Sequence, residues 1–139
     1  MASAAAAAAA AAGVGAHAAV AAAVVKPLTI ATHDQWFHAD ETGAVAMLKM
    51  LPRFAAAVVT RTRDEAVLKT QDIIVDVGGV YDPATHRYDH HQRSFAETFS
   101  AAHKTRLSSA GLVYKHFGRE IIHTLHPSLT PPQLDLMYA

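Results

Sequence analysis

Residues 72–79 read Asp72-Ile73-Ile74-Val75-Asp76-Val77-Gly78-Gly79, a short apolar run that two glycines close. A continuous apolar run of this length is typical of a strand that is buried on both faces of a parallel sheet. Two further β-branched segments, 28–32 and 55–61, are predicted as strands, and the periodicity between them predicts a helix over 41–51. With a short helix or turn at 64–69, this order predicts an α/β domain with a parallel sheet.

Polar residues follow two of the predicted strands. His33 comes directly after the strand at 28–32, and Asp76 lies near the end of the strand at 72–77. Ligands of parallel sheets gather beyond the carboxyl ends of the strands, so we expect these two side chains at one edge. His38 and Asp40 lie in the intervening loop, where Asp40 could instead cap the following helix at its N-terminus.

The rest of the chain is predicted to be less regular until two C-terminal helices. Tyr81-Asp82-Pro83 predicts a turn, and residues 93–106 predict a loop with room for a short helix. A helix capped by Ser108 or Ser109 is expected over 110–125. Thr130-Pro131-Pro132 begins another helix, and its early stop at residue 139 leads us to expect that the fold continues in further sequence.

Composition bounds the function. The 139 residues carry no formal net charge, so no overall basic field indicates nucleic-acid binding and no acidic field argues against it. Cysteine is absent, so a metal would have to be bound by His, Asp or Glu. Residues 1–25 are an alanine-rich, low-complexity extension with no clear signal or transit peptide and no convincing membrane span, which leaves 26–139 as the domain.

The segment Tyr88-Asp89-His90-His91 is the strongest candidate for chemistry. Imidazole and carboxylate groups are common ligands of zinc, manganese and iron. Neighbouring histidines diverge on a strand or loop, so one can bind metal while the other faces a substrate. The alternative is a capping aspartate beside two partly buried histidines, since short motifs match often by chance.

Five residues in this order predict a site for two metal ions rather than one. A two-metal site needs a carboxylate shared by ions about 3.5–4 Å apart, with other ligands on each side. Asp76 is the predicted bridge. His33 and His38 are expected to hold one ion, and Asp40 and His90 the other.

The chain also closely resembles the melanocyte-proliferating-gene family, which belongs with the DHH phosphoesterases. The resemblance covers about residues 28–139 and rests on runs that match in order and spacing at residues 32–41, 61–64, 72–83, 87–93 and 107–114. It implies a DHH-type phosphoesterase domain, of which this chain carries the N-terminal part. It also implies a two-metal, manganese-type phosphodiesterase that acts as a 3′→5′ RNA exonuclease in the nucleus or mitochondria; a cytoplasmic location is the alternative.

The resemblance assigns roles to individual residues. The family's metal positions correspond to His33, His38, Asp40, Asp76 and His90. His91 matches the histidine that faces the scissile phosphate, and Asp89 would orient His90 or its neighbour. Arg93 is a candidate phosphate contact, with a solvated surface arginine as the alternative. Manganese is the expected metal, with magnesium and zinc as alternatives. No membrane partner is expected, and the oligomeric state is left open.

The chain departs from the family pattern in its first motif. The family has a glycine-containing turn and a cysteine, where this chain has Asp34-Gln35-Trp36 and Ala39. Trp36 and Phe37 are candidates for stacking on bases, although Phe37 is expected in the core. The family also continues beyond this chain with a further aspartate motif and a substrate-gripping domain.

Two other functions are the alternatives to this enzyme. One is a truncated, catalytically impaired module that binds metal without turning over substrate. The other is a one-metal hydrolase of peptide or amide bonds, for which the chain shows no His-Glu-x-x-His motif.

Overall fold

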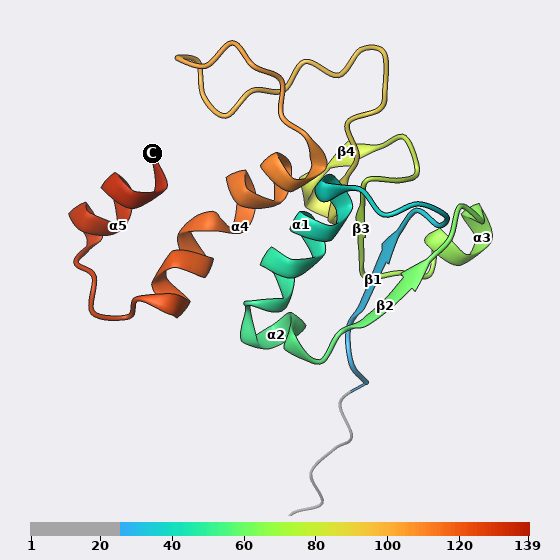
Figure 1. Cartoon of the computed structure of the whole chain (residues 1–139), viewed down its shortest axis with the longest axis horizontal. Coiled ribbons are helices and arrows are strands. Elements are labelled where there is room, and N and C mark those ends of the chain that lie inside the picture. The colour runs from blue at the N-terminus through green and yellow to red at the C-terminus, as the bar shows by residue number, and fades with distance from the viewer. Residues whose placement is uncertain (1–25) are drawn as a thin grey trace, which may run out of the picture.

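The structure is a computed structural model that describes residues 26–139; the predicted alanine-rich extension at 1–25 lies outside the described residues. It contains one five-stranded sheet with the order β2-β1-β3-β5-β4 (Figure 1). The strands are β1 (Thr29–Thr32), β2 (Val58–Arg61), β3 (Ile73–Val75), β4 (Tyr81–Asp82) and β5 (Arg87–Tyr88). All neighbouring pairs are parallel except β4 with β5. The predicted mixed α/β fold with a mostly parallel sheet is confirmed.

The helices also follow the predicted order. They are α1 (Ala39–Lys49), α2 (Pro52–Ala55), α3 (Glu65–Leu68), α4 (Ser109–Leu125) and α5 (Pro131–Tyr138), with a 3₁₀ turn at Pro83–Thr85. The predicted caps of the last two helices, Ser108 and Thr130, are confirmed. The alternative role considered for Asp40, capping α1, does not hold, because His38 is the N-cap residue and Asp40 lies inside the first turn.

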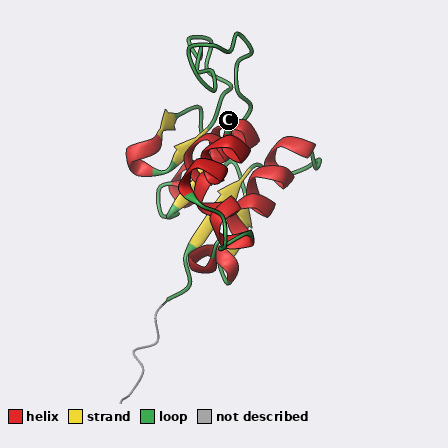
Figure 2. Ribbon diagram, turned by 90° about the vertical axis from the view of Figure 1, so that its left-hand side faces the viewer, coloured by secondary structure: helices red, strands yellow, loops and turns green. Residues whose placement is uncertain are grey.

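Helices α1 and α4 pack together on one face of the sheet, and α3 lies on the other (Figures 1 and 2). Successive side chains of a strand point to opposite faces of the sheet, so alternate residues of β3 pack against the helices on each face. Ile73 and Val75 join the core with Leu48 of α1 and Leu112 of α4. Ile74, between them, packs in a smaller cluster with Leu68 of α3 and with Ala31 and Val77. Each fully buried aliphatic side chain of this kind contributes about 1.5–3 kcal/mol of transfer free energy.

The hairpin formed by β4 and β5 was not predicted. The sequence pattern indicated only a turn at 81–83, whereas Tyr81 and Asp82 form a two-residue strand before the chain turns. A strand of two residues has too few positions to show a period of two, so the pattern could not identify it. The hairpin places Tyr88 beside Val75 of β3, and the Asp89-His90-His91 motif therefore begins where β5 ends.

Within residues 26–139, every helix is too short or too polar to serve as a membrane span.

Candidate metal centre

The ends of β1 and β3 bring two predicted site residues together. His33 follows β1 directly and Asp76 follows β3 directly; the His33 Nε2 atom lies 3.6 Å from Asp76 Oδ2, and both side chains are buried. The prediction that they share one edge of the sheet is confirmed. Asp76 has a φ of 57°, a left-handed conformation that non-glycine residues rarely adopt. Such strain persists where the surrounding structure enforces it and is common at functional sites.

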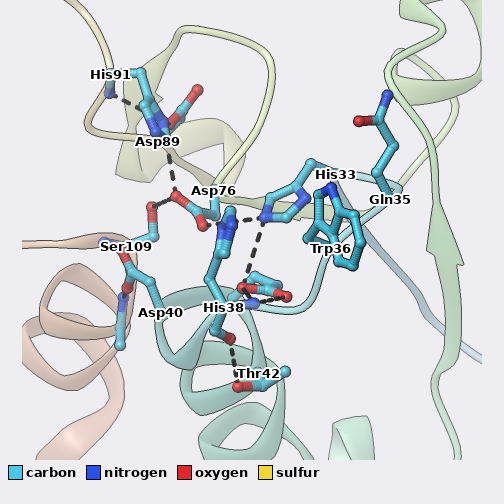
Figure 3. Close-up of polar contacts among 12 residues, drawn as sticks. His33, Gln35, Trp36, His38, Asp40, Thr42, Asp76, Asp89, His91 and Ser109 are labelled. Carbon is cyan, nitrogen blue, oxygen red and sulfur yellow. Dashed lines mark hydrogen bonds and ion pairs between the residues drawn. The ribbon is translucent and has the colours of Figure 1, made fainter.

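Four side chains form what we call the inner cluster: His33, His38, Glu41 and Asp76. Each offers one nitrogen or oxygen atom, and these atoms all lie within 4.8 Å of one another. Figure 3 shows His33, His38 and Asp76 pointing toward a common centre. The donor set of imidazole nitrogens and carboxylate oxygens suits a divalent transition metal.

The surroundings of the His33 ring provide a test of whether a metal ion fits the inner cluster. Its Nδ1 lies 2.8 Å from the carbonyl oxygen of Asp34, which can only accept, so Nδ1 carries the proton. Nε2 of His33 faces carboxylate oxygens of Glu41 and Asp76, at 3.5 and 3.6 Å. It is buried and has no hydrogen-bond partner among residues 26–139. A buried imidazole nitrogen without a hydrogen-bond partner, next to two carboxylates, offers a set of donor atoms that a divalent metal ion fits.

Glu41 is a member of the inner cluster that sequence reasoning missed. Both of its carboxylate oxygens accept from the backbone N–H of His38, at 2.7 and 2.9 Å, and Arg61 lies 3.6 Å away. Burial by itself would raise the pKa of Glu41, but the hydrogen bonds from backbone N–H groups and the charges of His33 and His38 lower it below its ordinary value. Glu41 is therefore a buried carboxylate that stays charged.

The outer cluster, as we define it, comprises Asp76, His90 and His91, whose ligand atoms also lie within 4.8 Å of one another. Asp76 thus belongs to both clusters: its Oδ2 faces His33, and its Oδ1 lies 3.4 Å from Nε2 of His90. Asp40 adds a second carboxylate, with Oδ2 at 3.2 Å from the same nitrogen of His90. The structure therefore brings all five sequence-predicted metal residues together around Asp76.

Asp40 has a further role that its sequence position did not reveal. Its carboxylate accepts from the backbone N–H groups of Ser109 and Ala110, at 3.1 and 2.5 Å, so it caps α4 rather than its own helix. The Ser109 hydroxyl donates to Asp76 Oδ1 at 3.1 Å. The N-terminus of α4 thus fixes two carboxylates of the site, and its partial positive charge stabilises the nearby anionic groups.

Burial is the main reason that the pKa of Asp76 is raised, and the charge of Asp40 raises it further. The hydrogen bond from Ser109 and the two neighbouring histidines act in the opposite direction. An aspartate that is costly to ionise because of burial and a neighbouring carboxylate is stabilised as an anion when a cation binds.

Asp89 orients His91, one of the two orientations expected from the sequence. Its Oδ1 accepts from Nδ1 of His91 at 2.6 Å and from the backbone N–H of His90 at 2.8 Å, and its Oδ2 accepts from Gly79 at 2.6 Å. The hydrogen bond that His91 donates to Asp89 raises the pKa of His91; partial burial acts against this, and the charges of Asp89, Asp76 and Asp40 add to the increase. Within residues 26–139, the contacts of the His91 ring are made by Nδ1, so Nε2 can contact another partner.

An open cavity of about 450 Å³ adjoins both clusters, and His33, His38, Asp76, Asp89 and His91 are among the residues that line it. Arg63 also lines the cavity, whereas Arg93 is exposed and does not. The phosphate contact expected of Arg93 therefore stays a prediction.

Phe37 was predicted to lie in the core, and that was wrong. Its side chain is 71% exposed, and the guanidinium of Arg61 lies 3.7 Å from the centre of its ring.

Comparison with known proteins identifies the family of this chain. The family model MYG1_exonuc, described as an uncharacterised protein family (UPF0160), matches residues 29–139. The chain belongs to this family. The resemblance to the melanocyte-proliferating-gene family that the sequence motifs indicated is thereby confirmed.

Curated relatives of this family member cover the same part of the chain. A MYG1 protein of Schizosaccharomyces pombe is 58% identical over 107 residues, which are 77% of this chain and 33% of the relative. The MYG1 exonuclease of Homo sapiens is 50% identical over 107 residues, which are 73% of this chain and 28% of the relative. The chain thus spans about a third or less of the curated relatives it matches. No solved structure matches it significantly.

Proposed function

We propose that this MYG1-family chain carries a two-metal phosphodiesterase centre of the DHH type, which acts on RNA as a 3′→5′ exonuclease. One observation carries the proposal: the two oxygens of Asp76 face two separate groups of ligands, one with His33 and one with His90. A shared carboxylate between two sets of ligands is the arrangement that a pair of catalytic ions requires. The exonuclease names of the mammalian relatives support a nucleic-acid substrate, and RNA is the substrate that we propose.

The residues divide between the two proposed ions as follows. His33, His38 and Glu41 would hold one ion together with Asp76, and Asp40 and His90 would hold the other. Manganese suits a set of imidazole and carboxylate ligands without thiolate, and magnesium and zinc are the alternatives. When bound, such ions neutralise phosphate oxygens and make water a better nucleophile.

His91 would contact the substrate itself. Asp89 holds the Nδ1 proton of His91, so Nε2 is the atom that can face a phosphate oxygen. Because the pKa of His91 is raised, a proton on Nε2 is favoured, and it can be donated to the phosphate. His91 is 63% exposed in its side chain, so a substrate can reach it from the cavity.

The test is release of mononucleotides from single-stranded RNA in the presence of Mn²⁺, with a label at either end. A 3′→5′ exonuclease frees a 3′ label at once and shortens 5′-labelled RNA stepwise. Asp76→Asn should abolish release, whereas Asp135→Asn, an exposed carboxylate on α5, should leave it unchanged. Release that persists in Asp76→Asn or in excess chelator would contradict the proposal.

The impaired-module alternative predicts a different result. If the chain binds manganese, with weaker binding in Asp76→Asn, but releases no nucleotide, the metal-binding half of the proposal stands and the exonuclease half fails. We also propose the mitochondrion or nucleus as the location, which a fluorescent fusion of the chain would test.

A further inference from the structure

Trp36 lies in the loop between the two histidines of the inner cluster and is strongly exposed. Its side chain is 80% exposed, although tryptophan is usually well buried. Among residues 26–139, no aromatic ring or guanidinium stacks on it, whereas the neighbouring Phe37 has Arg61 over its ring. Figure 3 shows the Trp36 ring outside the group of ligands. Both broad faces of a large aromatic ring are thus free for another partner.

The backbone that carries this ring is fixed. The Arg61 guanidinium donates to the carbonyl oxygens of Gln35 and Trp36, both at 3.3 Å. The Arg63 guanidinium donates to the Asp34 carboxylate at 3.1 Å. Gln35 adopts a φ of 68° in the left-handed region, which turns the chain outward just before Trp36. A rigid backbone with an exposed ring loses little conformational entropy when a partner binds.

The surroundings of Trp36 indicate the class of partner. Trp36 is two residues before His38, so the Cα atoms of the two residues lie within roughly 8 Å of each other. Two arginines, Arg61 and Arg63, donate hydrogen bonds to this loop, and Arg63 also lines the cavity. An aromatic face beside basic groups and a proposed metal centre suits a nucleotide, whose phosphate is anionic and whose base is flat.

We propose that Trp36 is a stacking platform for one nucleobase of single-stranded RNA, next to the nucleotide whose phosphate enters the cavity. This inference rests on the proposed nuclease function and adds a base-binding element to it. Stacking tolerates any base, because each has a π face, so Trp36 provides affinity without strong sequence preference.

The chain contains a single tryptophan, so its fluorescence reports on this position alone. Hydrolysis-resistant phosphorothioate oligoadenylate would be titrated in Mn²⁺ beside an abasic oligomer of the same length. We expect oligoadenylate to quench the fluorescence and the abasic oligomer to leave it nearly unchanged. Equal quenching by both oligomers, or none by oligoadenylate, would overturn the proposal.

Affinity measured with labelled oligomers provides the second readout. Trp36→Ala should weaken the binding of oligoadenylate about tenfold and the binding of the abasic oligomer much less. Trp36→Phe should retain most of the affinity. Leu136→Ala, on α5, is the matched control, because Leu136 is 81% exposed and should not affect binding. Unchanged oligoadenylate affinity in Trp36→Ala would overturn the proposal. Gel filtration provides a second check: if the unaltered chain self-associates and Trp36→Ala does not, the ring makes contacts between copies of the chain, and the proposal is also overturned.

The two proposals can fail separately. Base-dependent quenching without any nucleotide release supports the platform and contradicts the exonuclease function. Nucleotide release with the same KM in Trp36→Ala as in the unaltered chain supports the exonuclease function and contradicts the platform.

Discussion

The inner and outer clusters share Asp76 but are built in different ways. Glu41 and His33 of the inner cluster are buried, and Gln35, in the loop between His33 and His38, has a positive φ. The outer cluster is more exposed, with His90 at 30% and His91 at 63%, and the neighbouring carboxylates of Asp40 and Asp89 accept hydrogen bonds from backbone N–H groups.

The two clusters therefore stabilise their charged side chains in different ways. In the inner cluster, buried carboxylates depend on a few partners, so the loss of one leaves an uncompensated charge. In the outer cluster, backbone groups that belong to α4 and to the turn after β5 do the positioning, and water reaches the histidines. We therefore expect changes in the inner cluster to affect folding and changes in the outer cluster to affect chemistry more than stability.

Glu41→Ala should show the largest effect on the free energy of unfolding. It removes the acceptor of the His38 N–H and the partner of Arg61, and breaking a buried charged network costs about 3–5 kcal/mol. Urea denaturation followed by circular dichroism measures it. Glu65→Ala, a control with an 85% exposed carboxylate, should change stability very little. A loss below about 1 kcal/mol in Glu41→Ala would mean that the inner cluster is not stabilised by its charges.

Asp40→Ala should destabilise by about 1–2 kcal/mol, the usual cost of losing a helix cap. Two N–H groups at the start of α4 lose their acceptor, although water can replace part of the loss because Asp40 is half-buried. Asp40→Asn retains an acceptor oxygen and should lose less. The same denaturation experiment compares them; equal losses would indicate that charge, rather than hydrogen bonding, holds α4.

Gln35→Gly should stabilise the chain by about 0.5–1 kcal/mol. Glycine adopts a positive φ without strain, and this gain exceeds the added entropy of the unfolded chain. The family turn contains glycine in this segment, in agreement with this expectation. Gln35→Ala keeps the strain and is the control, which should not stabilise. A destabilised Gln35→Gly would show that the glutamine side chain contributes contacts that outweigh the strain.

Asp72 lies at the opposite end of β1 and β3 from both clusters. Its contribution to stability shows how small the effect of an exposed carboxylate is by comparison. Hydrogen bonds from the Thr29 hydroxyl and N–H hold its pKa below the ordinary value. A lowered pKa stabilises the fold at pH values above the unfolded pKa, and the contribution is lost as the pH falls through the folded pKa. The effect should be about 0.5 kcal/mol or less, because Asp72 is exposed and screened.

Urea denaturation of the unaltered chain and of Asp72→Asn is compared from a pH above the unfolded-state pKa of aspartate down to a pH below the folded-state pKa. The difference in unfolding free energy should shrink as the pH falls, since asparagine does not titrate. A difference that grows on acidification would contradict the assigned direction.

Much of the site could be predicted, because strand ends constrain side chains that are far apart in sequence. The runs before His33 and Asp76 were long enough to identify as strands, and parallel pairing then placed both residues at one edge. Glu41 was missed for a physical reason. A glutamate three residues after a helix cap has an ordinary capping role, and only burial against His33 distinguishes it.

Contacts that depend on docked elements could not be predicted. The hydrogen bond between Ser109 and Asp76 and the capping of α4 by Asp40 arise from how α4 packs on α1, and no local pattern encodes them. Phe37 was assigned to the core because it is apolar, but a cationic partner at the surface stabilises its exposed ring.

The bond from Asp40 to the start of α4 also bears on how the chain folds. Its partners, Ser109 and Ala110, lie 69 and 70 residues further along the chain. Closing a loop of that length costs entropy before any contact repays it, and contacts this distant slow folding. Asp40 therefore gains these two hydrogen-bond donors only when α4 docks against α1. A ribosome-bound chain that ends before residue 109 lacks the groups that orient Asp40, so the complete site forms only once that helix has been synthesised.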